Sequence, residues 1–225
     1  QLGFGVTSKD MILYLISLYT ASGGSGYVIE FSGSAIDSLS QEARFTLCNM
    51  AVEFGAFSAI IAPDDTTIQY IEGRPFSPKE RLWDQAVRYW SQLKTDSDAL
   101  FDKYITIDCV DIIPQVSWGT SPGHSGPVDG NIPVPTDAPD INSQRSWETA
   151  IDYMGLTPGT PIEGLPINGA FIGSCTNSRI TDLRAVAAIV KGRHVAEGVR
   201  AVVVPGSTQV KMAAEQEGLH IILQE

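Results

Sequence analysis

Residues 170–223 read AFIGSCTNSRITDLRAVAAIVKGRHVAEGVRAVVVPGSTQVKMAAEQEGLHIIL, and this stretch decides the fold class. Short apolar runs at 170–173 and 201–204 predict strands, and longer runs at 181–191 and 207–217, each followed by glycine, predict helices. The run 221–223 predicts the start of a third strand. A β-α-β-α-β order is typical of a parallel sheet with right-handed crossovers, in which the loops after the strands carry the site.

The first half of the chain predicts the same α/β class. Predicted helices lie at 7–19, 40–54, 64–72 and 77–93, and predicted strands at 27–31, 59–62 and 104–109. We therefore expect an α/β domain over 1–115, an irregular Pro- and Gly-rich interdomain crossing over 116–143, and the first part of a second α/β domain over 144–225. Largely parallel sheets are expected in both domains.

Composition limits the possible partners. The 225 residues are 43% hydrophobic and 18% charged, with a net charge of -11 and a pI near 4.6, which argues against binding nucleic acid or an acidic membrane. No run of 18 apolar residues and no signal peptide is visible, so a cytoplasmic protein is expected. Three widely spaced cysteines fit thiols in a reducing compartment. Both ends of the sequence suggest an internal piece of a longer protein.

Cys175 is the cysteine whose position suggests chemistry. It follows the predicted strand 170–173 and precedes a predicted helix, where backbone amides and the helix dipole favour a thiolate. A thiolate there can bind a metal or attack an electrophile, but a small buried thiol at a tight turn fits the same position. Position alone leaves both interpretations open.

The residues around Cys175 carry more information than its position. GSCTNS at 173–178 closely resembles the cluster-cysteine motif of the aconitase family. The resemblance implies that Cys175 is one of three thiolate ligands of a 4Fe-4S cluster whose fourth iron is open to substrate. The family's other two ligands lie in a later Cys-x-x-Cys that is missing here, and Cys48 and Cys109 do not match it. This fragment alone is therefore expected to hold no stable cluster and to be inactive.

A second motif, LCNMAVEFGA at 47–56, also resembles that family. Asn49 and Glu53 are four residues apart and would share one face of the predicted helix, where an exposed polar pair is the ordinary interpretation. The resemblance instead implies that Asn49 lies beside the cluster and that Glu53 contacts the substrate hydroxyl or an iron-bound water. A carboxylate in that place can transfer a proton, and an amide can hydrogen-bond cluster sulfide.

Further blocks at 62–67, 73–76 and 114–120 resemble the isopropylmalate branch of the family. The branch implies a hydro-lyase of leucine biosynthesis that interconverts 2- and 3-isopropylmalate, and a heterodimer with a small subunit that supplies a serine base. The expected ligand is a small hydroxy-diacid. A homoaconitase- or citramalate-type hydratase remains an alternative, because substrate choice depends largely on residues outside this segment.

Two other classes of function stay open from the residues. The glycine-rich segment 22–26 could belong to a non-catalytic domain that binds phosphate or nucleotide, as could the helix start at 206–207, although the loop lacks both common phosphate-loop patterns. A cysteine-nucleophile enzyme using Cys175 would need a nearby base. We expect His124, His194 and His220, and the cluster of Asp96, Asp98 and Asp102, to be solvated at the surface.

Overall fold

The computed structural model describes residues 2–173 and 176–225 and divides the chain into two compact units, 1–163 and 164–225. The first unit contains α1 (Ser8–Tyr19), β1 (Val28–Glu30), α2 (Ser34–Asp37), α3 (Gln41–Met50), β2 (Ser58–Ile60), α4 (Asp65–Ile71), α5 (Arg81–Trp90), β3 (Gln115–Ser117), β4 (Ser125–Pro127) and α6 (Ile141–Met154), with 3-10 turns at Cys109–Asp111 and Pro135–Asp137. The second contains β5 (Gly169–Ile172), α7 (Ile180–Val190), β6 (Arg200–Val203), α8 (Thr208–Gln216) and α9 (Leu219–Gln224). The predicted α/β class is confirmed.

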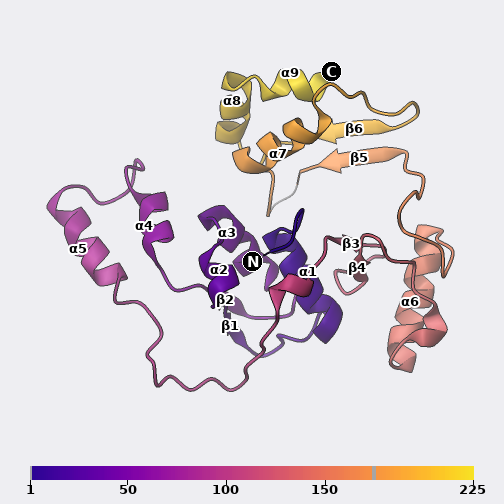
Figure 1. Ribbon diagram of the computed structural model, residues 1–225, viewed down its shortest axis with the longest axis horizontal. Coiled ribbons are helices and arrows are strands. Elements are labelled where there is room, and N and C mark those ends of the chain that lie inside the picture. The colour runs from indigo at the N-terminus through magenta and orange to yellow at the C-terminus, as the bar shows by residue number, and fades with distance from the viewer. Residues whose placement is uncertain (1, 174–175) are drawn as a thin grey trace. The chain divides into compact units, whose positions relative to one another are not determined.

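The core of the first unit forms where α1 packs against α3 beside the β1–β2 pair (Figure 1). The strands are parallel, with Ile29 opposite Ala59. Ile12 and Ile16 of α1 are fully buried together with Leu47 of α3. Burying each such side chain stabilises the fold by roughly 1.5–3 kcal/mol, which offsets the weak pairing of three-residue strands.

Local capping signals place most of the helices as the sequence predicts. Thr7 and Asp10 form a capping box at the start of α1, and the Ser40 hydroxyl accepts from the Ala43 N–H at the start of α3. Asp64 caps α4 through the Thr67 N–H. At the other end of a helix, Gly155 adopts the left-handed conformation (φ 65°) that closes α6.

The predicted crossing at 116–143 contains an antiparallel hairpin, β3–β4, with Val116 opposite Gly126. The buried Asp10 joins this hairpin to α1, because its carboxylate accepts from the Gln115 N–H at 2.7 Å as well as from Thr7. The hairpin and α6 both fall within the first unit, so the structure divides the chain after residue 163 rather than at the predicted crossing.

The predicted helix 77–93 is wrong at its start. Ser77, expected as its N-cap, donates its hydroxyl to the carbonyl of Ile71 and so completes the end of α4 instead. Glu80 has φ +50°, which is outside the helical region, and α5 begins only at Arg81. The last carbonyls of α4 and the first N–H groups of α5 both lack helical partners, and the Ser77 hydroxyl can bond to either. In this fold it bonds to the carbonyl of Ile71 in α4.

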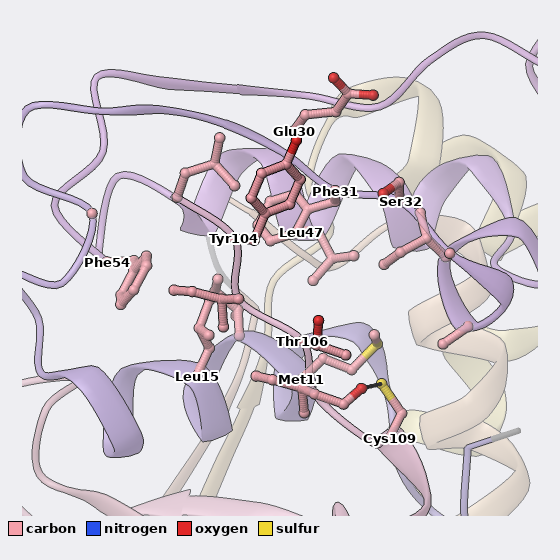
Figure 2. Close-up of a pocket in the computed structure, with 18 of the residues that line it drawn as sticks. Met11, Leu15, Glu30, Phe31, Ser32, Leu47, Phe54, Tyr104, Thr106 and Cys109 are labelled. Atoms are coloured by element: carbon pink, nitrogen blue, oxygen red, sulfur yellow. Dashed lines mark hydrogen bonds between the residues drawn. The ribbon is translucent and has the colours of Figure 1, made fainter. Parts of the chain in front are cut away.

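The predicted strand 104–109 is also wrong. Residues 104–108 are irregular, and Asp108 accepts from the Val110 N–H to start a 3-10 turn. A cavity of about 610 Å³ lies in this unit, with residues 103–109 and β1 among its lining (Figure 2). A strand needs a partner edge at hydrogen-bonding distance, and alternating side chains alone do not supply one.

The second unit is a β-α-β-α arrangement in which β5 and β6 pair in parallel, with Phe171 opposite Val202. Helices α7, α8 and α9 pack on one another around Leu183, Ala187 and Leu219. The predicted third strand at 221–223 is instead part of α9. Leu219, Ile222 and Leu223 recur at helical spacing and pack in this same cluster, so the 3.6-residue period prevails over β-propensity.

Candidate functional site

Asn49 and Glu53 lie at the carboxyl end of α3. The helix ends at Met50, four residues earlier than predicted, and Glu53 belongs to the following turn, 51–55. Two helical hydrogen bonds reach past the end, from the Ala51 N–H to the Leu47 carbonyl at 3.0 Å and from the Phe54 N–H to the Met50 carbonyl at 3.3 Å. Asn49 is exposed and Glu53 half-buried. Their side chains are thus available at one end of the helix, but not on one regular helical face.

The glycine-rich loop 22–26 lies against this turn. The Gly24 N–H donates to the Phe54 carbonyl at 2.9 Å, and a Cβ on Gly23 would overlap the Phe54 ring. Packing against Phe54 therefore accounts for both glycines. The Gly24 N–H is also occupied by its hydrogen bond to the Phe54 carbonyl, whereas in a phosphate-binding loop such an N–H points at the ligand.

His124 is buried, so the expectation of a solvated surface residue is wrong for it. Its exposed fraction is 7%, and its ring stacks on Trp118 at 4.9 Å between centroids. Nδ1 accepts from the Thr120 N–H at 3.2 Å, which places the ring proton on Nε2, 2.9 Å from the Ser146 hydroxyl of α6. Burial lowers the pKa of His124 below its usual 6.5. The neutral imidazole of His124 thus links the β3–β4 hairpin to α6 through its hydrogen bond to Ser146.

This arrangement predicts a pH-dependent stability. The unfolded chain takes up the His124 proton at higher pH than the folded chain does, so the free energy of unfolding should decrease as pH falls below about 6.5. His124→Phe should remove that component and, by deleting two hydrogen bonds, cost about 1–3 kcal/mol at pH 7. Urea unfolding followed by tryptophan fluorescence at pH 7.5 and 5.5 measures both effects. A His124→Phe protein that keeps the wild-type pH dependence would contradict the assignment.

The other surface expectations have mixed outcomes. His194 is exposed, with Nδ1 2.9 Å from the Glu225 carbonyl oxygen, and Asp96, Asp98 and Asp102 are exposed as predicted. His220 is half-buried in the first turn of α9, which corrects its predicted solvation. The sequence signal that could have located His124 was its spacing from Trp118, because a tight hairpin brings residues six apart face to face.

Cys175 lies outside the described residues, but the segment after it and the loop after β6 meet at the carboxyl edge of the β5–β6 pair. Ser178 is 3% exposed with φ +75°, and its hydroxyl donates to the Val204 carbonyl at 2.5 Å. The Gly206 N–H donates to the Ser178 carbonyl at 2.9 Å, and a Cβ on Gly206 would lie 2.9 Å from that oxygen. The two loops are therefore locked together at the edge where the parallel-sheet argument places a site.

The other two cysteines, Cys48 and Cys109, lie in the first unit. Cys48 and Cys109 are half-buried, and burial raises the pKa of both thiols; for Cys109 the Asp108 carboxylate raises it further. In the metal-free chain both thiols are therefore protonated at neutral pH. Within residues 2–173 and 176–225, no three His, Cys, Asp or Glu side chains gather in a way that could hold a metal ion.

In the same described ranges, no helix has both the length and the apolar character needed to cross a membrane.

Comparison with known proteins supplies what the geometry leaves open. The sequence profile of the aconitase family (aconitate hydratase) matches residues 1–225. The chain is 52% identical over 221 residues to the 3-isopropylmalate dehydratase large subunit of Roseiflexus castenholzii, which is 98% of this chain and 47% of that protein. It is 53% identical over 219 residues to the 3-isopropylmalate dehydratase large subunit 1 of Bradyrhizobium diazoefficiens, 97% of this chain and 46% of that protein. The chain thus spans about half the length of the curated relatives it matches.

Proposed function

The chain belongs to the aconitase family, and from this premise we propose that it is part of the large subunit of a 3-isopropylmalate dehydratase. The observation that carries the proposal is the identity of 52% and 53% to two such subunits over nearly the whole chain, a span that includes residues 47–56 and 173–178. The proposed enzyme is a hydro-lyase of leucine biosynthesis. It removes water from 2-isopropylmalate to give an unsaturated diacid and adds water back with hydroxyl and hydrogen exchanged, giving 3-isopropylmalate.

Glu53 is the residue of this chain proposed to act in the reaction. The departing hydroxyl needs a proton to leave as water, and a carboxylic acid in hydrogen-bonding reach can donate it and recover it from water in the second half of the reaction. The half-buried position of Glu53 at the end of α3 supports this role, because the side chain is held by a structured turn and still has access to solvent. Asn49, one turn earlier and exposed, is proposed to lie beside the cofactor.

The proposed cofactor is the 4Fe-4S cluster that enzymes of the aconitase family generally use. When bound, it supplies a Lewis acid that polarises the substrate hydroxyl. Cys175 is the residue of this chain proposed to bind it as a thiolate. Since Cys48 and Cys109 do not match the family's later Cys-x-x-Cys, we assign the remaining thiolate ligands to parts of the longer protein that this chain does not span.

The proposed partners follow from the same assignment. The name of the relatives includes the words large subunit, and we assign a small subunit to this protein as well, in a cytoplasmic heterodimer. The substrate is a small hydroxy-diacid. Neither nucleic acid nor a membrane surface is proposed as a partner, given the net charge of -11.

Two alternatives are separated by direct measurement. A homoaconitase- or citramalate-type hydratase would keep the chemistry and change the diacid. A phosphate-binding domain using residues 22–26 is disfavoured by the hydrogen bond from Gly24 to the Phe54 carbonyl. Titration with nucleotide or inorganic phosphate tests that second alternative.

A substrate panel tests the proposed function. The full-length protein, reconstituted anaerobically with iron, sulfide and its small subunit, should form an ultraviolet-absorbing unsaturated product from isopropylmalate. Its kcat/KM for isopropylmalate should exceed that for homocitrate, citramalate and citrate by at least about 10-fold. Citrate and homocitrate would bury an additional carboxylate where the isopropyl group binds, and citramalate would leave that apolar space unfilled. Preferential turnover of another acid would reassign the substrate, and turnover of none would reject the hydro-lyase.

A further inference from the structure

The turn that carries Glu53 interlocks with the glycine-rich loop 22–26. Phe54, the residue after Glu53, is 2% exposed, and its carbonyl accepts from the Gly24 N–H at 2.9 Å. A Cβ on Gly23 would lie 2.4 Å from a Phe54 ring carbon and 2.7 Å from the Tyr19 carbonyl oxygen. No side chain fits at position 23 unless the ring and backbone move apart.

The contact continues along the turn. A Cβ on Gly24 would lie 3.0 Å from the Phe54 ring and 3.2 Å from both the Cβ and the N of Ala56. Gly55 has φ +94°, and a Cβ there would come within 2.9 Å of the Ala21 carbonyl and the Ser25 hydroxyl. Three successive residues after Glu53 are therefore fixed by one loop.

Phe54 belongs to the hydrophobic core of the first unit and also borders its cavity. Gly23, Gly24 and Phe54 all line the cavity of about 610 Å³, and Figure 2 shows Phe54 at its margin. Glu53 does not line this cavity, so the two neighbouring side chains face different surroundings. The glycine loop supplies close contacts that help set the position of the buried Phe54 ring, and through the shared peptide bond that of Glu53.

We propose that the glycine-rich loop 22–26 positions the catalytic carboxylate, and that Gly24 is a positioning residue for Glu53. This inference rests on the proposed function, in which Glu53 exchanges a proton with the substrate hydroxyl. Proton transfer requires heavy atoms within about 2.6–3.2 Å, and a misplacement of about 1 Å can cost 100-fold in rate. Glycine is needed at position 24 because it lets the loop approach the turn closely enough to hold it.

The test uses the full-length protein assembled with its cluster and small subunit. Gly24→Ala adds a methyl group with contacts at 3.0–3.2 Å, which displaces the turn by a few tenths of an ångström. We expect kcat for isopropylmalate to fall about 10- to 100-fold, with KM and the melting temperature nearly unchanged. Gly126→Ala in β4 is the matched control, because a Cβ there meets nothing within 4 Å, and it should keep the wild-type kcat.

Two further variants separate positioning from a general structural effect. In a Glu53→Gln background, Gly24→Ala should cause no additional loss of kcat. If Gly24 acts only by positioning the Glu53 carboxylate, its substitution has no effect once that carboxylate is gone. The swap Gly24→Ala with Ala56→Gly removes the 3.2 Å contact between methyl groups and should recover part of kcat. If Gly24→Ala does not fold, Phe54→Leu is the second probe, with the same expected loss and the same non-additivity.

The outcomes distinguish this inference from the function on which it rests. A wild-type enzyme that turns over no hydroxy-diacid rejects both. An enzyme that Glu53→Gln slows to a low but measurable kcat, but in which Gly24→Ala or Phe54→Leu retains kcat, rejects the positioning role alone. So does a further loss of kcat in the Glu53→Gln background.

Discussion

In the full-length enzyme, Cys175→Ala is expected to abolish both the visible absorbance of the cluster and the turnover of isopropylmalate. A cubane cluster is held by cysteine thiolates, and removing one of the three proposed ligands leaves a second iron without its protein ligand. Iron and sulfide analysis, the visible absorption spectrum and the rate of product formation give three separate measurements. We expect cluster content below about one tenth of wild type, because the two remaining ligands should bind the cluster at least about 10-fold more weakly than all three.

Cys48→Ala and Cys109→Ala are the matched controls. Both thiols are half-buried in the first unit, and neither belongs to a Cys-x-x-Cys or to the GSCTNS motif. Each substitution should leave cluster content and turnover within about 2-fold of wild type while costing on the order of 1 kcal/mol of stability. A Cys175→Ala protein that keeps its cluster, or loss of the cluster in either control, would contradict the ligand assignment.

Asp64→Ala is expected to have the largest effect on the stability of the first unit, about 3–5 kcal/mol. Arg44 of α3 is 2% exposed, and its guanidinium donates to both carboxylate oxygens of Asp64 at 2.6 and 2.7 Å and to the Asp37 carbonyl at 3.0 Å. Removing Asp64 leaves a buried cation without its counter-ion, and it also removes the N-cap of α4. Both losses act in the same direction.

Urea unfolding at pH 7 followed by tryptophan fluorescence measures this effect, since all four tryptophans lie in the first unit. Asp65→Ala is the matched control, an exposed carboxylate one residue further along, and should cost less than about 1 kcal/mol. The Arg44 guanidinium holds the pKa of Asp64 at about 2, below its usual 3.8. The stability that this carboxylate contributes is thus present above pH 4 and lost as pH falls toward 2, and Asp64→Ala should lack this dependence. Equal costs for the two variants would contradict the ion-pair argument.

Short-range signals located most of the elements of this protein. The capping box of Thr7 and Asp10, the serine cap at Ser40 and the left-handed Gly155 act within one turn of chain, so the residues that form them are visible side by side in the sequence. The alternation of apolar runs and glycines in 164–225 likewise predicted β5, α7, β6 and α8. For the site, the resemblance of two motifs singled out Asn49, Glu53 and Cys175, whose roles stay predictions.

Tertiary contacts decided the rest, because the competing partners lie far apart in sequence. Ser77 caps the preceding helix instead of its own, residues 104–109 have no paired strand edge, and 221–223 joins a helical cluster. His124 is buried between the Trp118 ring, on which it stacks, and Ser146 of α6. The sequence by itself determined the α/β class, the caps and the motif residues. Only the tertiary structure decided that Gly24 lies against Phe54, thirty residues away, since the space beside a glycine is defined by whichever distant segment fills it.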